Sequence, residues 1–177
     1  MCIRDSGNAS AVVSWAPAAS GCVAGYIITP YVGSVAQLAT LIPGEGTTTV
    51  IPHLANGTTY RFTVTAENGS ILGPDSPLSV PVTVGTPTAA TALKAVKAAP
   101  GAISVAWKAP RANGAPIIRY TATCKSSNGG AAKAKSAKTA PLTVVGLTAG
   151  KTYTCIVTAA NSRGTGPPSA RSAGVKA

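Results

Sequence analysis

Few residues of this chain carry the side chains on which enzymes rely. His53 is the only histidine, and the acids are limited to Asp5, Glu45, Glu67 and Asp75. A catalytic site needs a nucleophile, a base and a group that orients the base, and no such set can be assembled from these positions. A glycine-rich phosphate loop after a strand and paired carboxylates at a defensible spacing are also missing. The sequence therefore predicts no catalysis, no cofactor and a turn position for His53.

The cysteines could support redox or metal chemistry. Cys22 lies in a predicted loop and has no equivalent partner in its own half of the chain. Cys124 and Cys155 lie in predicted strands, and no third or fourth metal ligand lies near them in the sequence. A metal site is therefore not expected. Two alternatives remain for this pair, a disulfide or two buried thiols that act as small hydrophobic side chains.

Charge is distributed very unevenly along the chain. Residues 1–87 hold two arginines and four acids, a net charge of 2 − 4 = −2, whereas residues 88–177 hold nine lysines, four arginines and no acid, a net charge of +13. A region with this charge attracts polyanions, and its candidate contacts are Lys133, Lys135, Lys138 and Arg163. The alternative is a solvated basic surface that only confers solubility. Because no aromatic residues alternate with these charges, sequence-specific nucleic-acid recognition is not expected.

The elements that position these residues are revealed by an internal repeat. The motif Leu54-x-x-Gly57-x-x-Tyr60 returns 93 residues later as Leu147-x-x-Gly150-x-x-Tyr153. Trp15 and Tyr26 return as Trp107 and Tyr120, with offsets of 92 and 94. A small drift of this kind is what loop insertions produce, so the chain contains two copies of one domain.

Each copy has the pattern of an all-β domain. Short alternating segments are separated by Gly, Pro, Asn and Ser, and no segment shows a helical period over three turns. The expected strands lie near 10–16, 24–32, 37–42, 47–53, 58–67 and 77–84 in the first copy, and near 91–97, 102–108, 117–125, 131–137, 140–146, 151–160 and 169–176 in the second. No run of 18 apolar residues occurs, so no membrane span is predicted. The boundary between the copies is expected near Gly85-Thr86-Pro87.

The two copies resemble fibronectin type III domains. The resemblance rests on Trp15-Ala16-Pro17 and Trp107-Lys108-Ala109-Pro110, on Gly25-Tyr26 and Arg119-Tyr120, and on the segments 54–68 and 147–161. It implies two immunoglobulin-like β-sandwiches in tandem, at 7–86 and 87–177. It also implies a core built around Trp15, Tyr26, Leu54, Tyr60, Trp107, Tyr120, Leu147 and Tyr153. The Ala- and Thr-rich style is similar to that of domains in bacterial secreted or cell-surface proteins.

The first six residues do not follow the repeat. Met1-Cys2-Ile3-Arg4-Asp5-Ser6 is similar to a translated sequencing adaptor, so these residues are predicted to be a non-native tag. About eleven residues, 88–98, precede the point in the second copy that aligns with Gly7. The first domain is therefore expected to lack its first strand, which would leave one sheet edge unpaired.

The resemblance favours the disulfide among the two alternatives for Cys124 and Cys155. In the fibronectin type III fold the third and sixth strands are neighbours in one sheet. Alternation places Cys124 on the same face as Tyr120, and Cys155 on the same face as Tyr153. Facing residues on adjacent strands are close enough to be bridged. A disulfide would in turn indicate an oxidising compartment.

The resemblance implies a non-catalytic, extracellular spacer or interaction module of a larger secreted or surface protein. Its expected partners are the flanking domains of the same chain and cell-wall or extracellular polymers. One alternative is an accessory segment of a secreted polysaccharide hydrolase. Another is a weak polyanion-binding module that acts through the basic second domain.

Overall fold

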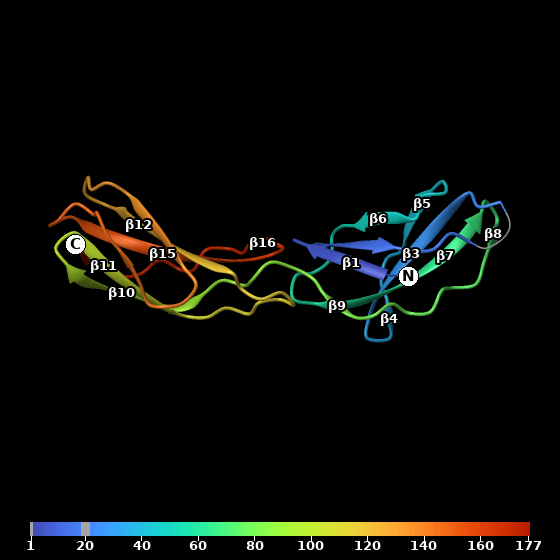
Figure 1. Ribbon diagram of the computed structural model, residues 1–177, viewed down its shortest axis with the longest axis horizontal. Coiled ribbons are helices and arrows are strands. Elements are labelled where there is room, and N and C mark those ends of the chain that lie inside the picture. Colours follow the sequence, from blue (N-terminus) through green and yellow to red (C-terminus); the bar gives the residue numbers. More distant parts are fainter. Residues whose placement is uncertain (1, 19–21) are drawn as a thin grey trace. The chain divides into compact units, whose positions relative to one another are not determined.

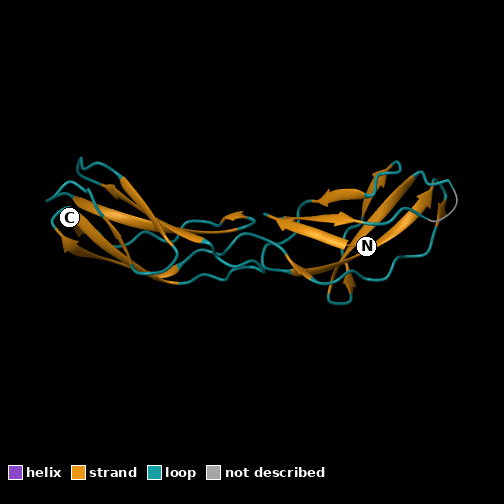
Figure 2. Ribbon diagram, in the orientation of Figure 1, coloured by secondary structure: helices purple, strands orange, loops and turns teal. Residues whose placement is uncertain are grey.

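The computed structural model describes residues 2–18 and 22–177, and this part of the chain consists of strands and loops (Figures 1 and 2). It divides into two compact units, Met1–Gly85 and Thr86–Ala177. We refer to these units as domain one and domain two. The boundary agrees with the break predicted near Gly85-Thr86-Pro87, and the all-β class is confirmed.

Domain one is a sandwich of two antiparallel sheets. The smaller sheet has the order β1-β2-β6, formed by Cys2–Gly7, Ser10–Ser14 and Thr48–Ile51. The larger sheet has the order β4-β3-β7-β8, formed by Val35–Ala36, Gly25–Val32, Thr59–Asn68 and Ile71–Leu72. Two further strands join it: β5 (Thr40–Pro43) pairs with β3, and β9 (Val82–Thr83) pairs with β7.

Domain two repeats this plan. Its smaller sheet has the order β10-β11-β14, formed by Thr91–Ala99, Ala102–Lys108 and Leu142–Val144. Its larger sheet has the order β13-β12-β15-β16, formed by Lys133–Ala137, Arg119–Ser126, Thr152–Asn161 and Gly164–Thr165. The last strand, β17 (Val175–Lys176), pairs with β15.

A separate hydrophobic core fills each sandwich. Alternating residues of the facing strands supply it, as on the inner faces of two packed sheets. The eight residues of the repeat motifs are all buried, with exposed fractions of 9% or less: Trp15, Tyr26, Leu54, Tyr60, Trp107, Tyr120, Leu147 and Tyr153. In both domains the tryptophan packs against the tyrosine of the next long strand, with ring centroids 5.2 Å apart in domain one and 5.1 Å apart in domain two.

A tyrosine corner explains the spacing of the repeated motif. The backbone N–H of Ala55 donates to the hydroxyl of Tyr60 at 3.0 Å, and that of Thr148 donates to the hydroxyl of Tyr153 at 2.9 Å. To bring the tyrosine back over this turn, the chain passes through left-handed backbone conformations at Gly57 (φ 83°) and its counterpart Gly150 (φ 80°). Glycine adopts this conformation without strain, so both the glycine and the tyrosine are retained at the same spacing in the two copies.

The prediction that domain one lacks its first strand is wrong. Cys2–Gly7 forms β1 and pairs with β2 from Gly7↔Ser10 to Cys2↔Ser14, with a bulge between Ile3 and Asp5. Backbone pairing requires a chain of suitable length and direction rather than a matching sequence, so β1 forms although its residues do not follow the repeat. The origin of residues 1–6 as a non-native tag stays a prediction.

The seventh strands are much shorter than predicted. Only Val82–Thr83 and Val175–Lys176 are strands within the expected ranges 77–84 and 169–176. In the first range, Pro77 and Pro81 lack the N–H that a ladder needs. Where the seventh strand does not pair, serine hydroxyls take the place of backbone carbonyls as acceptors for the neighbouring strand. Ser76 and Ser79 accept from the amides of Val64 and Phe62, and Ser169 and Ser172 accept from those of Val157 and Cys155, each at 3.0 Å. These four contacts are called the serine ladder below.

Candidate functional site

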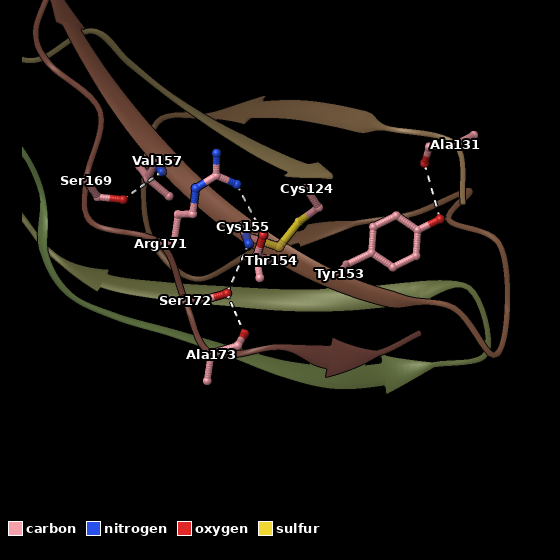
Figure 3. Close-up of a disulfide and its surroundings, with 10 residues drawn as sticks. All are labelled: Cys124, Ala131, Tyr153, Thr154, Cys155, Val157, Ser169, Arg171, Ser172 and Ala173. Atoms are coloured by element: carbon pink, nitrogen blue, oxygen red, sulfur yellow. Dashed lines mark hydrogen bonds between the residues drawn. A yellow bond between two sulfur atoms is a disulfide. The ribbon is translucent and has the colours of Figure 1, made fainter. Parts of the chain in front are cut away.

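The larger sheet of domain two contains the disulfide that was predicted. Cys124 on β12 lies directly opposite Cys155 on β15, with their α-carbons 4.1 Å apart, and the two residues are bonded (Figure 3). Both side chains are fully buried in the core of domain two. The disulfide is therefore confirmed, and the alternative of two buried thiols is wrong. Domain one has Pro30 opposite Phe62 at the equivalent position.

Three other candidates for chemistry, Cys22, His53 and Asp75, are all exposed. Cys22 is an exposed free thiol. His53 is exposed and has a left-handed backbone conformation, with φ 60°, in the bend between β6 and β7. Asp75 accepts a hydrogen bond from the hydroxyl of Thr65. No group of three or more His, Cys, Asp or Glu side chains that could hold a metal ion occurs among the described residues.

Two of the four predicted polyanion contacts lie together on β13. This strand is at the edge of its sheet, and its register places Lys133 opposite Cys124 and Lys135 opposite Ala122. Residues that face each other across an antiparallel pair share one side of the sheet, so both lysines start on the core side. Both residues are exposed, because the core side is open to solvent at this edge. Charges that point inward at an edge also discourage pairing with another strand.

Lys133 extends across this open side. Its Cε lies 3.7 Å from the position that a β-carbon on Gly146 would occupy, and Gly146 follows β14 of the opposite sheet. The aliphatic stem of the lysine therefore reaches from one sheet toward the other, while its ammonium group can stay in water.

The structure separates the other two predicted contacts from this pair. Lys138 follows the end of β13, where Ala137 lies opposite Tyr120. Arg163 comes two residues after β15 ends at Asn161, and Asn161 is six residues beyond Cys155, which is about 20 Å along a strand. Its guanidinium group donates to the backbone carbonyl of Asn113 at 2.6 Å. The four residues therefore do not form one cluster.

A second group of cations lies on the outer face of the same sheet. Alternation places Arg119 and Lys125 on the side of β12 opposite to the disulfide, and both are exposed. Lys125 pairs with Thr154, and the guanidinium group of the exposed Arg171 donates to the hydroxyl of Thr154 at 3.4 Å (Figure 3). None of these three residues was among the polyanion contacts predicted from the sequence. The same alternation that placed Cys124 inward could have placed Arg119 and Lys125 outward.

Comparison with known proteins defines the family. The family model of the fibronectin type III domain matches residues 2–82 and 86–175. The chain belongs to this family. The first match begins within β1, in agreement with the paired first strand of domain one. No curated protein is similar enough to match the chain.

Solved structures of tandem fibronectin type III domains are similar at low identity. The FN1–FN3 domains of chicken CNTN1 match 97% of this chain with 19% identity and a TM-score of 0.47. The chain spans 65% of the length of that CNTN1 segment. A two-domain fibronectin type III segment of chicken tenascin matches 99% of this chain, and 96% of its own length, with 16% identity and a TM-score of 0.49.

Membership in this family sets the general role of the chain. Fibronectin type III domains in tandem are modules for spacing or interaction, and they are generally non-catalytic. The combination of such domains with a disulfide is typical of extracellular proteins. In the described part of the chain, no helix has the length and apolar character needed to cross a membrane.

Proposed function

We propose that the two domains form a non-catalytic spacer of a larger extracellular protein. The observation that carries this proposal is the direct succession of two complete sandwiches, with domain one ending at Gly85 and domain two starting at Thr86. Each domain has its own core and its own tyrosine corner, so each can keep its shape without the other. A junction with so little free chain between the domains favours a defined separation of the two ends.

The buried disulfide supports the extracellular part of the proposal. Disulfides persist in oxidising compartments and are rare in the reducing cytosol. Cys124 and Cys155 are both fully buried, so the bond is shielded from exchange with external thiols. We expect mass spectrometry of the chain isolated from its natural source to find these two cysteines bonded before any reduction.

A distance measurement tests the spacer. In a chain with Cys2→Ser and Ser162→Cys, spin labels are attached to Cys22 in domain one and to position 162 in domain two. Both labelled positions are exposed. A spacer predicts one narrow distance distribution between the two labels. A broad distribution that changes with viscosity or temperature would show two domains on a loose joint and would contradict the proposal.

A second candidate function is weak polyanion binding by domain two. It is favoured by the two cation groups of the larger sheet, Lys133 with Lys135 at the edge and Lys125 with Arg171 on the outer face. No acid neutralises them, because domain two contains no Asp or Glu. An approaching sulfate or phosphate polymer would release its counterions to exposed cations, so binding should weaken steeply with salt.

Retention of the full chain on heparin tests this second function. Three double variants remove the same two charges from different places: Lys133→Gln with Lys135→Gln, Lys125→Gln with Arg171→Gln, and Lys94→Gln with Lys108→Gln on the other sheet. If the larger sheet binds the polymer, one of the first two variants elutes at clearly lower salt than the third. Equal elution of all three would show a uniformly solvated basic surface and would contradict a binding site.

A further inference from the structure

Domain one contains three triplets that match the acceptor motif for N-linked glycans, Asn-x-Ser/Thr. They are Asn8-Ala9-Ser10, Asn56-Gly57-Thr58 and Asn68-Gly69-Ser70. A glycan of this kind is bulky and polar, so its asparagine must lie at the surface. All three asparagines are exposed, and exposure alone does not separate them. Their contacts do, because an amide nitrogen that carries a sugar gives up one of its two N–H donors.

Asn8 and Asn56 hold two loops of domain one together. The side-chain amide of Asn56 donates to the side-chain oxygen of Asn8 at 2.7 Å, and its oxygen accepts from the backbone N–H of Ala9 at 2.7 Å. Asn56 also lies so close to Gly85 that a β-carbon on this glycine would collide with its amide. These contacts join the turn between β1 and β2 to the tyrosine corner, and a sugar on the nitrogen of Asn56 would compete with them.

The side chain of Asn68 has no such structural task. It lies at the end of β7, and its side chain forms no hydrogen bond with another residue that the structure describes. The turn that follows is held by the backbone, because the amide of Ser70 donates to the carbonyl of Asn68 at 2.7 Å. Gly69 has φ 64°, and Ser70 is exposed. Asn68 can therefore carry a sugar without loss of a contact that holds the fold.

The counterpart of Asn68 in domain two is used differently. Asn161 also ends its strand, but it is only 4% exposed. Its side-chain amide donates to the carbonyl of Ala112 at 2.9 Å, and its side-chain oxygen accepts from the backbone N–H of Arg163 at 2.9 Å. An arginine stands where the acceptor motif needs a hydroxyl, and no Asn-x-Ser/Thr triplet occurs in residues 86–177.

An exposed apolar side chain faces Asn68 across the hairpin of β7 and β8. Asn68 pairs with Ile71, which is 71% exposed, and the β-carbons of such a pair are about 5 Å apart on the same side. Leu72 is 62% exposed, but it pairs with Glu67 and lies on the other side. In domain two Asn161 pairs with Gly164, which has no side chain to cover. The acceptor motif and an apolar neighbour therefore occur together in domain one, and domain two has neither.

We propose that Asn68 carries an N-linked glycan whose first sugar packs over Ile71. In the transfer, the side-chain nitrogen of Asn68 attacks the anomeric carbon of an oligosaccharide linked to a polyprenyl diphosphate. A bond forms between this carbon and the nitrogen, the bond from the carbon to the diphosphate oxygen breaks, the diphosphate leaves with the electron pair, and the nitrogen loses one proton. Secretory compartments in which this transfer takes place also allow the disulfide of domain two to form. The site depends on neither the spacer nor the polyanion function.

Secretion of the full chain from yeast behind a cleavable leader tests the attachment. We expect the intact mass of the secreted chain to fall on treatment with peptide N-glycosidase, and position 68 to become aspartate. Ser70→Ala should remove this glycan. The matched control is Ser10→Ala with Thr58→Val, which destroys the other two triplets but keeps Asn8 and Asn56, and it should leave the glycan in place. A secreted chain without a glycan on Asn68, or with glycans only on Asn8 or Asn56, would overturn the proposal.

Nuclear Overhauser contacts in the glycosylated chain test the packing over Ile71. The methyl groups of isoleucine and leucine are labelled, and Ile71→Val and Leu72→Val assign the two signals. We expect contacts from the first sugar to the methyl groups of Ile71 and none to those of Leu72, because successive side chains of a strand point to opposite faces. Contacts to Leu72 in place of Ile71, or to neither residue, would overturn the packing of the sugar over Ile71.

Discussion

The two domains share one frame of hydrogen bonds from side chains to the backbone, and they differ in the contact at the centre of the larger sheet. The serine ladder has bonds of 3.0 Å in both domains, and the tyrosine corner has bonds of 3.0 Å and 2.9 Å. At the centre of the larger sheet, however, domain one packs Pro30 opposite Phe62, whereas domain two bonds Cys124 to Cys155. A few side chains that bond to the backbone therefore fix the fold, and the core contacts between them can be exchanged.

The edges of the larger sheets differ for a related reason. Pro30 has no N–H, and its carbonyl accepts from the amide of Gln37 at 2.8 Å. The N–H and the C=O of one residue in an antiparallel strand point to the same neighbouring strand. Since Pro30 lacks this N–H, pairing with the edge is interrupted there, and the edge consists of two short strands, β4 and β5. Cys124 keeps its N–H, and β13 continues through five residues. Leu38, which lies in the gap of domain one, is 92% exposed.

The largest effect is expected from a substitution that removes the aromatic core contact specific to domain one. Phe62 is fully buried, so Phe62→Ala should reduce the free energy of unfolding of domain one by roughly 3–5 kcal/mol. Urea unfolding followed by Trp15 fluorescence in a Trp107→Phe background measures this change. Domain two, followed by Trp107 in a Trp15→Phe background, should not respond. A loss below about 1 kcal/mol would mean that Phe62 does not replace the disulfide as the central core contact.

An intermediate effect tests the frame that the domains share. Ser79→Ala and Ser172→Ala each leave a buried amide, that of Phe62 or that of Cys155, without its acceptor. Each variant should destabilise its own domain by roughly 1–3 kcal/mol. Exposed serines provide the matched controls, and Ser70→Ala and Ser162→Ala should change stability by less than about 0.5 kcal/mol. A large cost in only one domain would show that the serine ladder is not a common element.

The smallest expected effect concerns the sheet edges. Leu38→Lys should leave the stability of domain one within about 0.5 kcal/mol, because the side chain is almost fully exposed. It should reduce self-association in sedimentation velocity at high concentration, and Lys135→Leu should increase it, because charges at an edge discourage strand pairing. If the two changes shift self-association in the same direction, the contrast between the edges has no consequence in solution.

The sequence was sufficient for the parts of the fold that the repeat marks. Trp15, Tyr60 and their counterparts occupy positions set by packing and by the tyrosine corner, so their types and spacing are retained. The prediction of the disulfide succeeded for the same reason, since strand alternation fixes the side on which Cys124 and Cys155 lie. The first strand of domain one was missed because its pairing depends on backbone geometry and its residues do not follow the repeat.

The other differences between the prediction and the structure have separate physical causes. The seventh strands were predicted too long because alternation cannot show that the hydroxyls of Ser79 and Ser172 accept in place of backbone carbonyls. Lys138 was grouped with Lys133 and Lys135 because the end of β13, between Ala137 and Lys138, is not marked in the sequence. The cavity of domain one that Trp15, Tyr26 and Gly73 line could not be predicted, because it depends on the packing of several elements around Gly73.

Reduction of the disulfide tests the central comparison most directly. The bond joins residues 31 positions apart, and its loss should lower the free energy of unfolding of domain two by roughly 3–4 kcal/mol. We expect the urea transition reported by Trp107, in the Trp15→Phe chain, to move to lower urea when the chain is reduced. The transition reported by Trp15, in the Trp107→Phe chain, should stay in place. Movement of both transitions, or of neither, would contradict the conclusion that the two domains share one hydrogen-bonded frame and differ in the contact at the centre of the larger sheet.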